Sequence, residues 1–440
     1  MSFPIYPNYK DSGVEWWGDM PGAWGLFPAK RSFIRKKELN RGMKCENRLS
    51  LTLGGVVPRD LDDLDGLQAS EFETYQIFSA DDLVFKLIDL QNIKTSRVGL
   101  VPEMGIMSPA YIRIEPNKAK VAPKFAYWFF TNLYNRCIFN ELGVGVRQTI
   151  SSEELLLLPY PAFPIPEQTQ IATFLDRETA KIDELVAEQH RLMELLKEKR
   201  QAVISHAVTK GLNPDAPMKP SGIEWLGDVP AHWERTPIKY VAKVGNGSTP
   251  SREIQEYWGE TGFPWLNSSV VNSSVVTKAE GFVTERALRE CHLPVIVPPA
   301  ILVGITGQGR TRGMAAMLGI EATINQHVAY VKPSMAGLDV HYLLRVLESA
   351  YLKLRRDSEE AGATKGAITC EQIKNLHVPL PPLVEQCAIS AFLDTESAKF
   401  NSLTAEAQRA IDLLQERRTA LISAAVTGQI DVRAITSYEL

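Results

Sequence analysis

Four short stretches of the sequence combine basic side chains with amides, hydroxyls and glycines. They are residues 94–97 (KTSR), 145–148 (GVRQ), 307–312 (GQGRTR) and 364–366 (TKG). Arginine and lysine hold phosphates and bind guanine edges, whereas asparagine and glutamine bind adenine edges. Together with one further arginine, these stretches supply the candidate DNA-binding residues, which are Lys94, Ser96, Arg97, Arg147, Gln148, Arg252, Arg310, Arg312 and Lys365.

Each candidate also has a plainer interpretation as a solvated charge beside a turn. Arg147 and Lys365 occupy equivalent places, 218 residues apart, and for these two residues both interpretations stay open. Glycines flank Arg310 and Arg312. Because glycine lets a backbone approach a ligand closely, the loop around these two arginines favours a DNA contact.

A basic cluster spans residues 30–48, where eight basic side chains stand against two acidic ones. It could be a solvated helix face or a phosphate-binding surface. Its counterpart in the second half of the chain is less basic, with Lys243 and Arg252 beside residues 245–250 (GNGSTP). The formal net charge of −4 argues against a protein that coats nucleic acid by overall charge, but it is compatible with a local basic surface.

Motifs that would carry catalysis or bind a metal are missing from the sequence. It contains no N-P-P-[FY] or D-P-P-[FY] string of an amino-methyltransferase, no G-x-x-x-x-G-K-[ST] nucleotide loop and no H-E-x-x-H. The five cysteines are scattered, without a C-x-x-C pair or a nearby histidine at ligand spacing. We therefore predict no catalytic residues, no metal site and no cofactor in this chain.

Two segments of the sequence occur twice. The repeated pairs are residues 10–30 with 219–239 and residues 167–209 with 385–427. The segments that follow residues 10–30 and 219–239, about 31–158 and 240–378, agree only faintly. A unit written twice in this way predicts one scaffold that carries two different surfaces.

The repeated segments 167–209 and 385–427 are predicted to be long helices, because both lack glycine and proline and are rich in good helix formers. Apolar residues recur in alternating steps of three and four, which is the pattern of a coiled-coil seam. At 1.5 Å per residue each helix would be roughly 65 Å long. The predicted coiled-coil and partner-docking positions are Ile171, Leu175, Ile182, Leu185, Leu192, Leu196, Ile389, Leu393, Phe400, Leu403, Leu414 and Leu421.

An antiparallel pair of these two helices within the chain is the preferred arrangement, and it would relate the two halves by a pseudo-twofold axis. A parallel pair, a larger bundle or pairing with another chain would also bury the seams. Proline-rich strings at residues 159–166 and 379–382 force extended backbone before each helix. These strings mark the joints between helix and domain.

The middle segments mix strand-like runs, such as residues 82–87 and 328–331, with helical stretches such as residues 124–132 and 340–354. The predicted fold is therefore an α/β (α+β) domain in two copies, separated by two long helices that form an antiparallel coiled coil. The predicted boundaries are 1–160 for the first domain, 161–210 for the first helical spacer, 211–378 for the second domain and 379–440 for the second helical spacer.

The sequence gives no sign of export or of membrane insertion. No run reaches the roughly 18 apolar residues that a membrane span needs, and the N-terminus lacks the basic start and apolar core of an export signal. Scattered, unpaired cysteines are typical of the reducing cytoplasm. We expect a cytoplasmic protein without a membrane partner.

Several motifs are specific enough to indicate a family. They are 380–386 (LPPLVEQ) with Ile389 and 392–394 (FLD), their first copy 164–168 (PIPEQ) with Ile171 and 174–176 (FLD), the paired S-G-[VI]-E-W-x-G-D-x-P strings, and 245–250 followed by 257–258 (YW) and 264–265 (PW). By these motifs the chain resembles specificity subunits of type I restriction-modification enzymes over nearly its whole length.

The resemblance implies that residues 1–160 and 211–378 are target recognition domains, each reading one half of a bipartite, asymmetric double-stranded DNA target. It implies that the long helices space the two domains and dock methyltransferase subunits, two of them, and a restriction or translocase subunit. S-adenosylmethionine, Mg²⁺ and ATP would bind those partner subunits. The biological role would be phage defence.

Two other functions compete with this one. The chain could be a coiled-coil adaptor with two ligand-binding domains that does not act on DNA. It could also be a self-contained methyltransferase or nuclease, but the missing motifs disfavour an enzyme.

Overall fold

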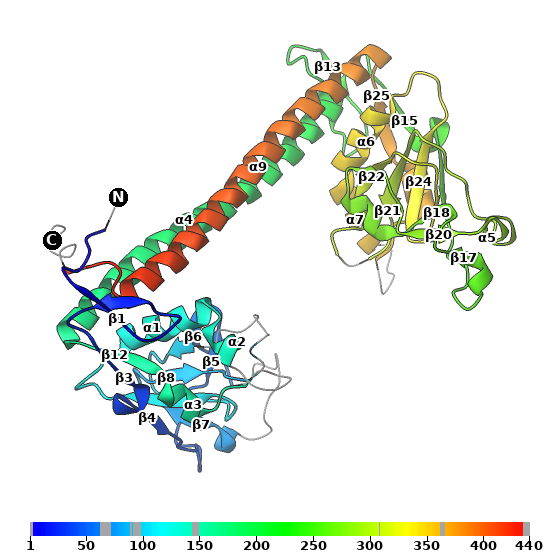
Figure 1. Ribbon diagram of the computed structural model, residues 1–440. Coiled ribbons are helices and arrows are strands. Elements are labelled where there is room, and N and C mark those ends of the chain that lie inside the picture. Colours follow the sequence, from blue (N-terminus) through cyan, green and yellow to red (C-terminus); the bar gives the residue numbers. More distant parts are fainter. Residues whose placement is uncertain are drawn as a thin grey trace. The chain divides into compact units, whose positions relative to one another are not determined.

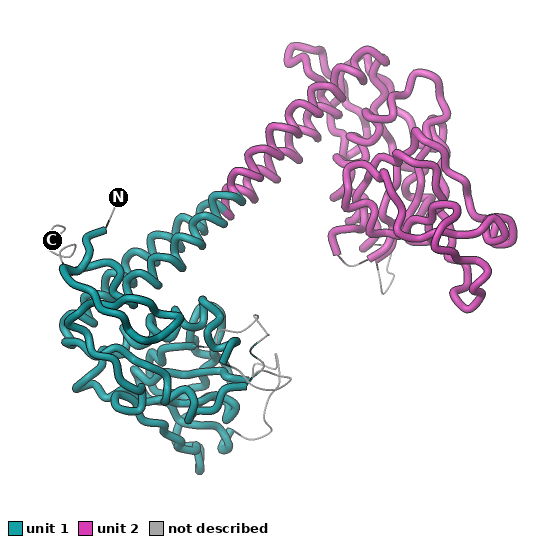
Figure 2. Tube along the Cα trace, in the orientation of Figure 1, with its two compact units in different colours: residues 1–189, 408–440 teal, residues 190–407 magenta. Residues whose placement is uncertain are grey.

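The computed structural model describes residues 3–61, 72–88, 90, 98–142, 149–307, 309–360 and 366–433. Two compact units make up the chain (Figure 2). The first unit contains residues 1–189 and 408–440, and the second contains residues 190–407. These units differ from the four consecutive segments predicted from the sequence, because both ends of each long helix pack into the core of a unit.

The two long helices are α4 (Ile165–Lys210) and α9 (Leu383–Val426), shown in green and orange-red in Figure 1. In the first unit, Arg418 Nε of α9 lies 2.8 Å from Asp183 Oδ1 of α4. In the second unit, Arg200 of α4 donates to Asn401 of α9 at 2.9 Å. From the first of these contacts to the second, the residue number rises along α4 and falls along α9. The two helices are therefore antiparallel, as predicted.

The seam of this pair differs in part from the predicted one. Most of the predicted seam residues are buried or half-buried, namely Ile171, Leu175, Ile182, Leu196, Ile389, Leu393, Phe400, Leu414 and Leu421. Leu185, Leu192 and Leu403 are instead 50%, 43% and 46% exposed. The seam between the helices passes through Val186 and Met193 on α4, which are half-buried. A seam that repeats every 3.5 residues requires a step of four after Ile182, and the leucine at a step of three points outward.

The joint between each domain and its helix is made by a glutamine that is fully buried. In the first unit, the Gln168 side chain accepts from the Ala122 amide at 2.9 Å and donates to the Phe163 carbonyl at 2.8 Å. In the second unit, Gln386 accepts from the Asp339 amide at 2.8 Å and donates to the Pro381 carbonyl at 2.8 Å. The repeated Glu-Gln motif therefore has a structural role that needs no ligand.

The glutamate of the same motif ties the other repeated segment to the helix. Trp24 Nε1 donates to Glu167 at 3.0 Å, and Trp233 Nε1 donates to Glu385 at 2.8 Å. The far end of the other long helix reaches the same tryptophan. Gly428 has a φ of 76°, and a side chain there would meet Trp24 and Pro21. Both copies of each repeated segment are alike because the segment with the tryptophan and the long helices pack against one another in the same way in both units.

The first unit is built on a sheet with the order β4-β11-β8-β9, in which neighbouring strands are antiparallel. Helix α1 contacts β9, and the aromatic side chains Phe125, Phe129 and Phe130 of α1 are buried in the core. The elements of this unit are β1 (Tyr9–Asp11), β2 (Asp19–Pro21), β3 (Gly25–Pro28), β4 (Phe33–Lys36), β5 (Leu49–Thr52), β6 (Gly55–Pro58), β7 (Gln76–Phe78), β8 (Leu83–Phe85), β9 (Val98–Leu100), β10 (Gly105–Met107), β11 (Ile112–Pro116), α1 (Pro123–Asn135), α2 (Ile138–Leu142), α3 (Ser152–Leu157) and β12 (Pro159–Ala162).

The second unit repeats this arrangement in its sheet β16-β24-β21-β22-β19. Helix α6 contacts β21 and β22 and buries Tyr342, Leu343 and Val346. The elements of this unit are β13 (Met218–Pro220), β14 (Asp228–Pro230), β15 (Glu234–Pro237), β16 (Ala242–Asn246), β17 (Trp258–Gly259), β18 (Phe263–Leu266), β19 (Val275–Val276), β20 (Gly281–Val283), α5 (Glu285–Glu290), β21 (Ala300–Gly304), β22 (Ala315–Leu318), β23 (Thr323–Ile324), β24 (Val328–Pro333), α6 (Val340–Ser349), α7 (Tyr351–Glu360), α8 (Cys370–Asn375) and β25 (His377–Leu380).

The mixed α/β (α+β) fold predicted from the sequence is confirmed. The proline-rich strings are extended as predicted, because β12 pairs with β3 and β25 pairs with β15. The helical stretch predicted at residues 340–354 is two helices, α6 and α7, which meet at Ala350. In the part of the chain that the structure describes, no helix is both long enough and apolar enough to cross a membrane.

Candidate nucleic-acid interface

Three connections of the second unit leave the same end of its sheet. Asn246 at the end of β16 pairs with Ala329 near the start of β24, and Gly304 at the end of β21 pairs with Val328. β22 begins beside that end of β21. The connections 247–254, 305–314 and 325–327 therefore gather at one place, although they are far apart in the sequence.

The first of these connections is held by two tryptophans. Trp265 Nε1 donates to the Ser248 carbonyl at 3.2 Å, and Trp258 Nε1 donates to the Ser251 carbonyl at 3.1 Å. The guanidinium carbon of Arg252 lies 4.7 Å from the centre of the Trp258 ring. This cation–π contact positions an arginine that is otherwise exposed. The predicted candidate Arg252 is thus on the surface of the sheet end.

A charged network lies beside Trp258, on α5 and the turn before β17. Arg286 and Tyr257 both bond to the carboxylate of Glu290 at 2.8 Å. These two bonds, first of all that from Arg286, hold the pKa of Glu290 below its ordinary value. The bond to Glu290 raises the pKa of Tyr257. The negative charge of Glu290 is therefore compensated by the positive charge of Arg286 beside it.

Helix α7 holds the second connection, which contains the GQGRTR sequence. The Tyr351 hydroxyl donates to the Arg310 carbonyl at 2.9 Å, and Arg355 Nη1 donates to the Gly309 carbonyl at 2.7 Å. These bonds fix the backbone on both sides of Arg310, whose own side chain is exposed. The structure thus presents Arg310 on a loop that is braced from behind.

Arg312, at the end of the same GQGRTR sequence, is placed differently from the prediction. Its side chain is only 4% exposed, and its Nη2 lies 2.6 Å from Glu359 of α7. A guanidinium in this position faces the protein and not a DNA groove. Arg312 therefore holds the loop to α7, and the predicted contact with DNA does not fit this structure.

The third connection was missed by the sequence analysis. Residues 325–327 (NQH) form a turn between β23 and β24, in which the Asn325 side chain is buried and accepts from the His327 amide at 2.9 Å. Gln326 is exposed. The Thr249 hydroxyl from the first connection donates to Gln326 at 2.5 Å. No glycine, lysine or arginine marks this turn, and only its place between two strands could have indicated it.

The first unit has the same three connections at the same end of its sheet. Lys36 at the end of β4 pairs with Arg113 near the start of β11, and Phe85 at the end of β8 pairs with both Ile112 and Val98. Lys94, Ser96 and Arg97 belong to the sequence that connects β8 to β9, and they lie outside the described residues. Their counterpart in the second unit is the connection that carries Arg310.

The segment that precedes α3, and the one that precedes α8, also reach these sheet ends. The Ile150 amide donates to the Leu87 carbonyl at 3.2 Å, and the Ile368 amide donates to the Ile305 carbonyl at 2.8 Å. Leu87 comes two residues after the end of β8, and Ile305 directly follows β21. Three candidates from the sequence come just before these bonds and lie outside the described residues, namely Arg147, Gln148 and Lys365.

The basic cluster at residues 30–48 begins in a 3-10 turn (Ala29–Arg31) and continues through strand β4 and the connection that follows it, so it is not one solvated helix face. Arg48 is turned inward, is 6% exposed and donates to the Asp60 carbonyl at 3.1 Å. Lys37, Arg41 and Lys44 are exposed on the connection. These three cations lie on a connection that leaves the sheet end of the first unit.

A buried ion pair stabilises the sheet behind these connections. Arg113 Nε lies 2.6 Å from Asp82 Oδ2, with both side chains 3% exposed, and Arg113 also donates to the Ile77 carbonyl at 2.6 Å. Burial raises the pKa of Asp82, while the Ser79 amide and Arg113 act in the opposite direction. Arg113 is basic but belongs to the scaffold.

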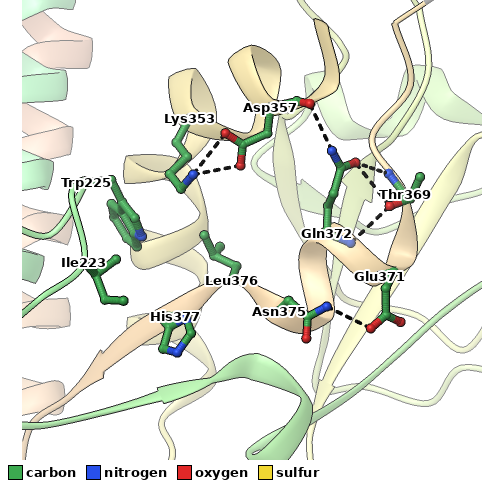
Figure 3. Close-up of a pocket in the computed structure, with 10 residues that line it drawn as sticks. All are labelled: Ile223, Trp225, Lys353, Asp357, Thr369, Glu371, Gln372, Asn375, Leu376 and His377. Carbon is green, nitrogen blue, oxygen red and sulfur yellow. Dashed lines mark hydrogen bonds and ion pairs between the residues drawn. The ribbon is translucent and has the colours of Figure 1, made fainter. Parts of the chain in front are cut away.

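Figure 3 shows a pocket of about 440 Å³ in the second unit, between α7, α8 and the 223–225 segment. Its polar side chains bond to one another: Lys353 pairs with Asp357 at 2.8 Å, and Gln372 donates to the Asp357 carbonyl at 3.1 Å. An acidic lining with its one lysine already paired does not suit a phosphate. The pocket lies on the side of α7 that carries Lys353 and Asp357, whereas Tyr351 and Arg355 brace the GQGRTR loop.

Within the described ranges, no three or more histidine, cysteine, aspartate and glutamate side chains come together in a way that could hold a metal ion.

Comparison with known proteins finds a family model that matches part of the chain. Residues 230–412 match the type I restriction modification DNA specificity domain. The chain is 24% identical over 306 residues to the type I restriction enzyme EcoR124I/EcoR124II specificity subunit of Escherichia coli, covering 68% of this chain and 69% of that protein. It is 23% identical over 337 residues to the putative type I restriction enzyme MjaX specificity subunit of Methanocaldococcus jannaschii, covering 76% and 74%.

Solved structures share the fold. A chain from a study titled "Structural basis underlying complex assembly and conformational transition of the type I R-M system" superposes with a TM-score of 0.70 and 17% identity, covering 93% of this chain and 99% of that one. The HsdS subunit from Thermoanaerobacter tengcongensis gives 0.52 and 16%, covering 93% and 98%. The resemblance to type I specificity subunits that the sequence motifs predicted is confirmed.

Proposed function

We propose, from this confirmed resemblance to type I specificity subunits, that the chain reads a bipartite double-stranded DNA target sequence-specifically within a restriction-modification complex. The observation that carries the proposal is the pair of matched sheet ends. The strands of both sheets end so that equivalent connections leave each at the same place, and the sequences of these connections differ between the units, whereas the joints to the helices are the same. Two different reading surfaces on one scaffold suit an asymmetric target.

The side chains at the sheet ends suit this task. Specific binding needs cations for phosphates and polar groups for base edges. Arg252 and Arg310 are exposed and held in place in the second unit. Lys37, Arg41 and Lys44 are exposed in the first. Local cations of this kind act over distances near the Debye length of about 8 Å at physiological salt, so the net negative charge of the chain does not oppose them.

The long helices are proposed to space the two half-sites and to dock methyltransferase subunits. Leu185 and Leu403, which occupy equivalent places in the sequence repeat, are both about half exposed. A repeated apolar surface residue supports two equivalent docking sites and hence two methyltransferase subunits. S-adenosylmethionine, Mg²⁺ and ATP would bind the methyltransferase and restriction subunits, and this chain would supply recognition without catalysis.

An adaptor that does not act on DNA is the weaker alternative. It would account for the paired helices, but it gives no reason for the held arginines at the sheet end of the second unit or for the exposed cations at that of the first. The match of residues 230–412 to a DNA specificity domain also favours DNA recognition.

Single-molecule methylome sequencing tests the proposal. The chain is expressed with a type I methyltransferase subunit in a host that lacks such systems, and the same host with the methyltransferase alone is the control. We expect a new methylated motif of two half-sites with a fixed gap, only when the chain is present. Identical methylomes in the two strains would contradict the proposal.

A further inference from the structure

The turn 325–327 at the sheet end of the second unit holds one side chain in a particular orientation. Gln326 is exposed, yet both ends of its amide are bonded. The Thr249 hydroxyl donates to Gln326 Oε1 at 2.5 Å, and Gln326 Nε2 lies 3.2 Å from His327 Nε2. An amide nitrogen only donates, so His327 Nε2 is the acceptor. A surface glutamine that binds no ligand would not need two hydrogen-bond partners to orient its side chain.

The imidazole of His327 is itself oriented from behind. Its Nδ1 lies 2.8 Å from the Thr306 hydroxyl, at the start of the connection that carries Arg310. Because Nε2 accepts, Nδ1 carries the proton and donates to Thr306. The His327 carbonyl accepts from the Ile305 amide at 3.0 Å. The chain Thr306, His327, Gln326, Thr249 thus ties the three connections of the sheet end together.

The backbone of the turn is fixed as firmly as its side chains. The Asn325 amide donates to the Leu266 carbonyl at 3.0 Å, and the Asn325 side chain is 5% exposed. Gly247 passes so close that a side chain there would lie 1.7 Å from the Ile324 carbonyl. Only glycine fits at this position, and the close approach brings Thr249 into reach of Gln326.

Two hydrogen-bonding positions of the Gln326 amide remain. Each amide has two N–H groups and a carbonyl oxygen that accepts twice, and one of each is used by His327 and Thr249. The remaining donor and acceptor belong to the same planar amide. Adenine offers the matching pair in the major groove, with N7 as acceptor and the N6 amino group as donor.

We propose that Gln326 reads an adenine in the half-site bound by the second unit, with Thr249 and His327 as positioning residues. The inference rests on the proposed function and names the residue and the base. Gln326 lies between Arg252 and Arg310 in the order of the connections around the sheet end, so the cations hold the backbone of the DNA while the amide meets a base edge.

The test uses the full chain with its methyltransferase partner and compares methylomes and binding to duplexes that differ by one base pair. The variants are Gln326→Ala and Gln326→Glu. The matched control is Asn213→Ala, which removes an exposed amide of the same unit from the connection between α4 and β13. Thermal unfolding of each variant checks that the fold is kept.

We expect Gln326→Ala to lose roughly 5- to 150-fold of the discrimination for adenine at one position of one half-site, since a bidentate pair is worth about 1–3 kcal/mol. The other half-site and the gap stay unchanged. Gln326→Glu should shift the preference at the same position toward cytosine, whose amino group a carboxylate can accept. Asn213→Ala should behave like the unmodified chain.

Full discrimination at every position in Gln326→Ala would overturn the inference, and so would a uniform loss of binding to all sequences. A chain that methylates no motif in its unmodified form contradicts the proposed function itself, which separates the two failures. Thr249→Val tests the positioning role. It keeps Gln326 but removes its donor partner, and we expect weaker discrimination at the same position with the same preferred base.

Discussion

Three arginines in the second unit show how the surroundings of a residue decide what it can do. Arg252 stacks on Trp258, and Arg310 projects from a loop whose backbone is bonded to α7. Arg312 belongs to the same loop but is buried against Glu359. The residue type is the same in each case. Only the first two present a free guanidinium edge to a ligand.

Arg310→Ala and Arg312→Ala are therefore expected to separate DNA binding from stability. Arg310→Ala should weaken DNA binding and leave the melting temperature unchanged, because its side chain is exposed. If Arg310 contacts a phosphate, the slope of log affinity against log salt falls by about one. Arg312→Ala should lower the free energy of unfolding by about 1–3 kcal/mol, because it removes a buried charge-assisted bond.

Fluorescence anisotropy across a salt series and urea unfolding measure the two effects. Equal loss of stability in both variants would show that Arg310 is part of the scaffold. Unchanged affinity in Arg310→Ala would remove it from the reading surface.

The candidate site could be predicted from the sequence only in part, for reasons that lie in particular residues. The GQGRTR loop was predictable because glycines and arginines are adjacent in the sequence. Gln326 was not, because Thr249, which bonds to it, and Thr306, which bonds to its neighbour His327, are brought to the turn by pairing of β16, β21 and β24. The buried state of Arg312 also depends on α7, which no local pattern around the loop reveals.

At the scale of the elements, the antiparallel pair of α4 and α9 is stabilised along a seam that only partly follows the leucines. Ile411 is 2% exposed on α9, whereas Leu413, two residues later, is 65% exposed. The helices and their joints were predictable because both copies of each repeated segment keep the residues that pack together. The exact residues of the seam were not predictable. On α4, the leucine three residues after a seam position and the valine or methionine four residues after it are both apolar, so the sequence pattern does not choose between them.

Ile411→Ala and Leu413→Ala form a matched pair that tests this seam. Ile411→Ala should lower the free energy of unfolding by about 2–5 kcal/mol, because it leaves a cavity between the helices. Leu413→Ala should change it by less than about 0.5 kcal/mol, as exposed substitutions usually do. Chemical unfolding measures both. Comparable losses in the two variants would contradict the observed seam.

At the scale of the whole molecule, each compact unit uses residues from both halves of the chain. The first unit needs the end of α9, where Gly428 meets Trp24. The second unit needs the end of α4. The repeat therefore serves two purposes: it keeps the helix joints identical, and it leaves the sheet ends free to differ.

The proposed spacer role can be tested by lengthening both helices without shifting the seam. Seven residues are inserted after Arg191 and after Arg409, which are equivalent exposed positions of α4 and α9. One heptad keeps the seam in register and adds about 10 Å, or about three base pairs. We expect the methylated motif to gain a longer gap with both half-sites unchanged. Altered half-sites with an unchanged gap would contradict the spacer role.

The most direct test of the central claim, that each unit reads its own half-site, is the methylome of a chain in which residues 240–376 are replaced by a second copy of residues 31–158. The two segments end at matched bonds, since the Ala29 amide bonds to the Leu158 carbonyl and the Ile238 amide bonds to the Leu376 carbonyl. If each unit reads one half-site, both half-sites of the new motif contain the same bases, and those bases match one half of the original motif. A motif that keeps its original second half-site would contradict the account.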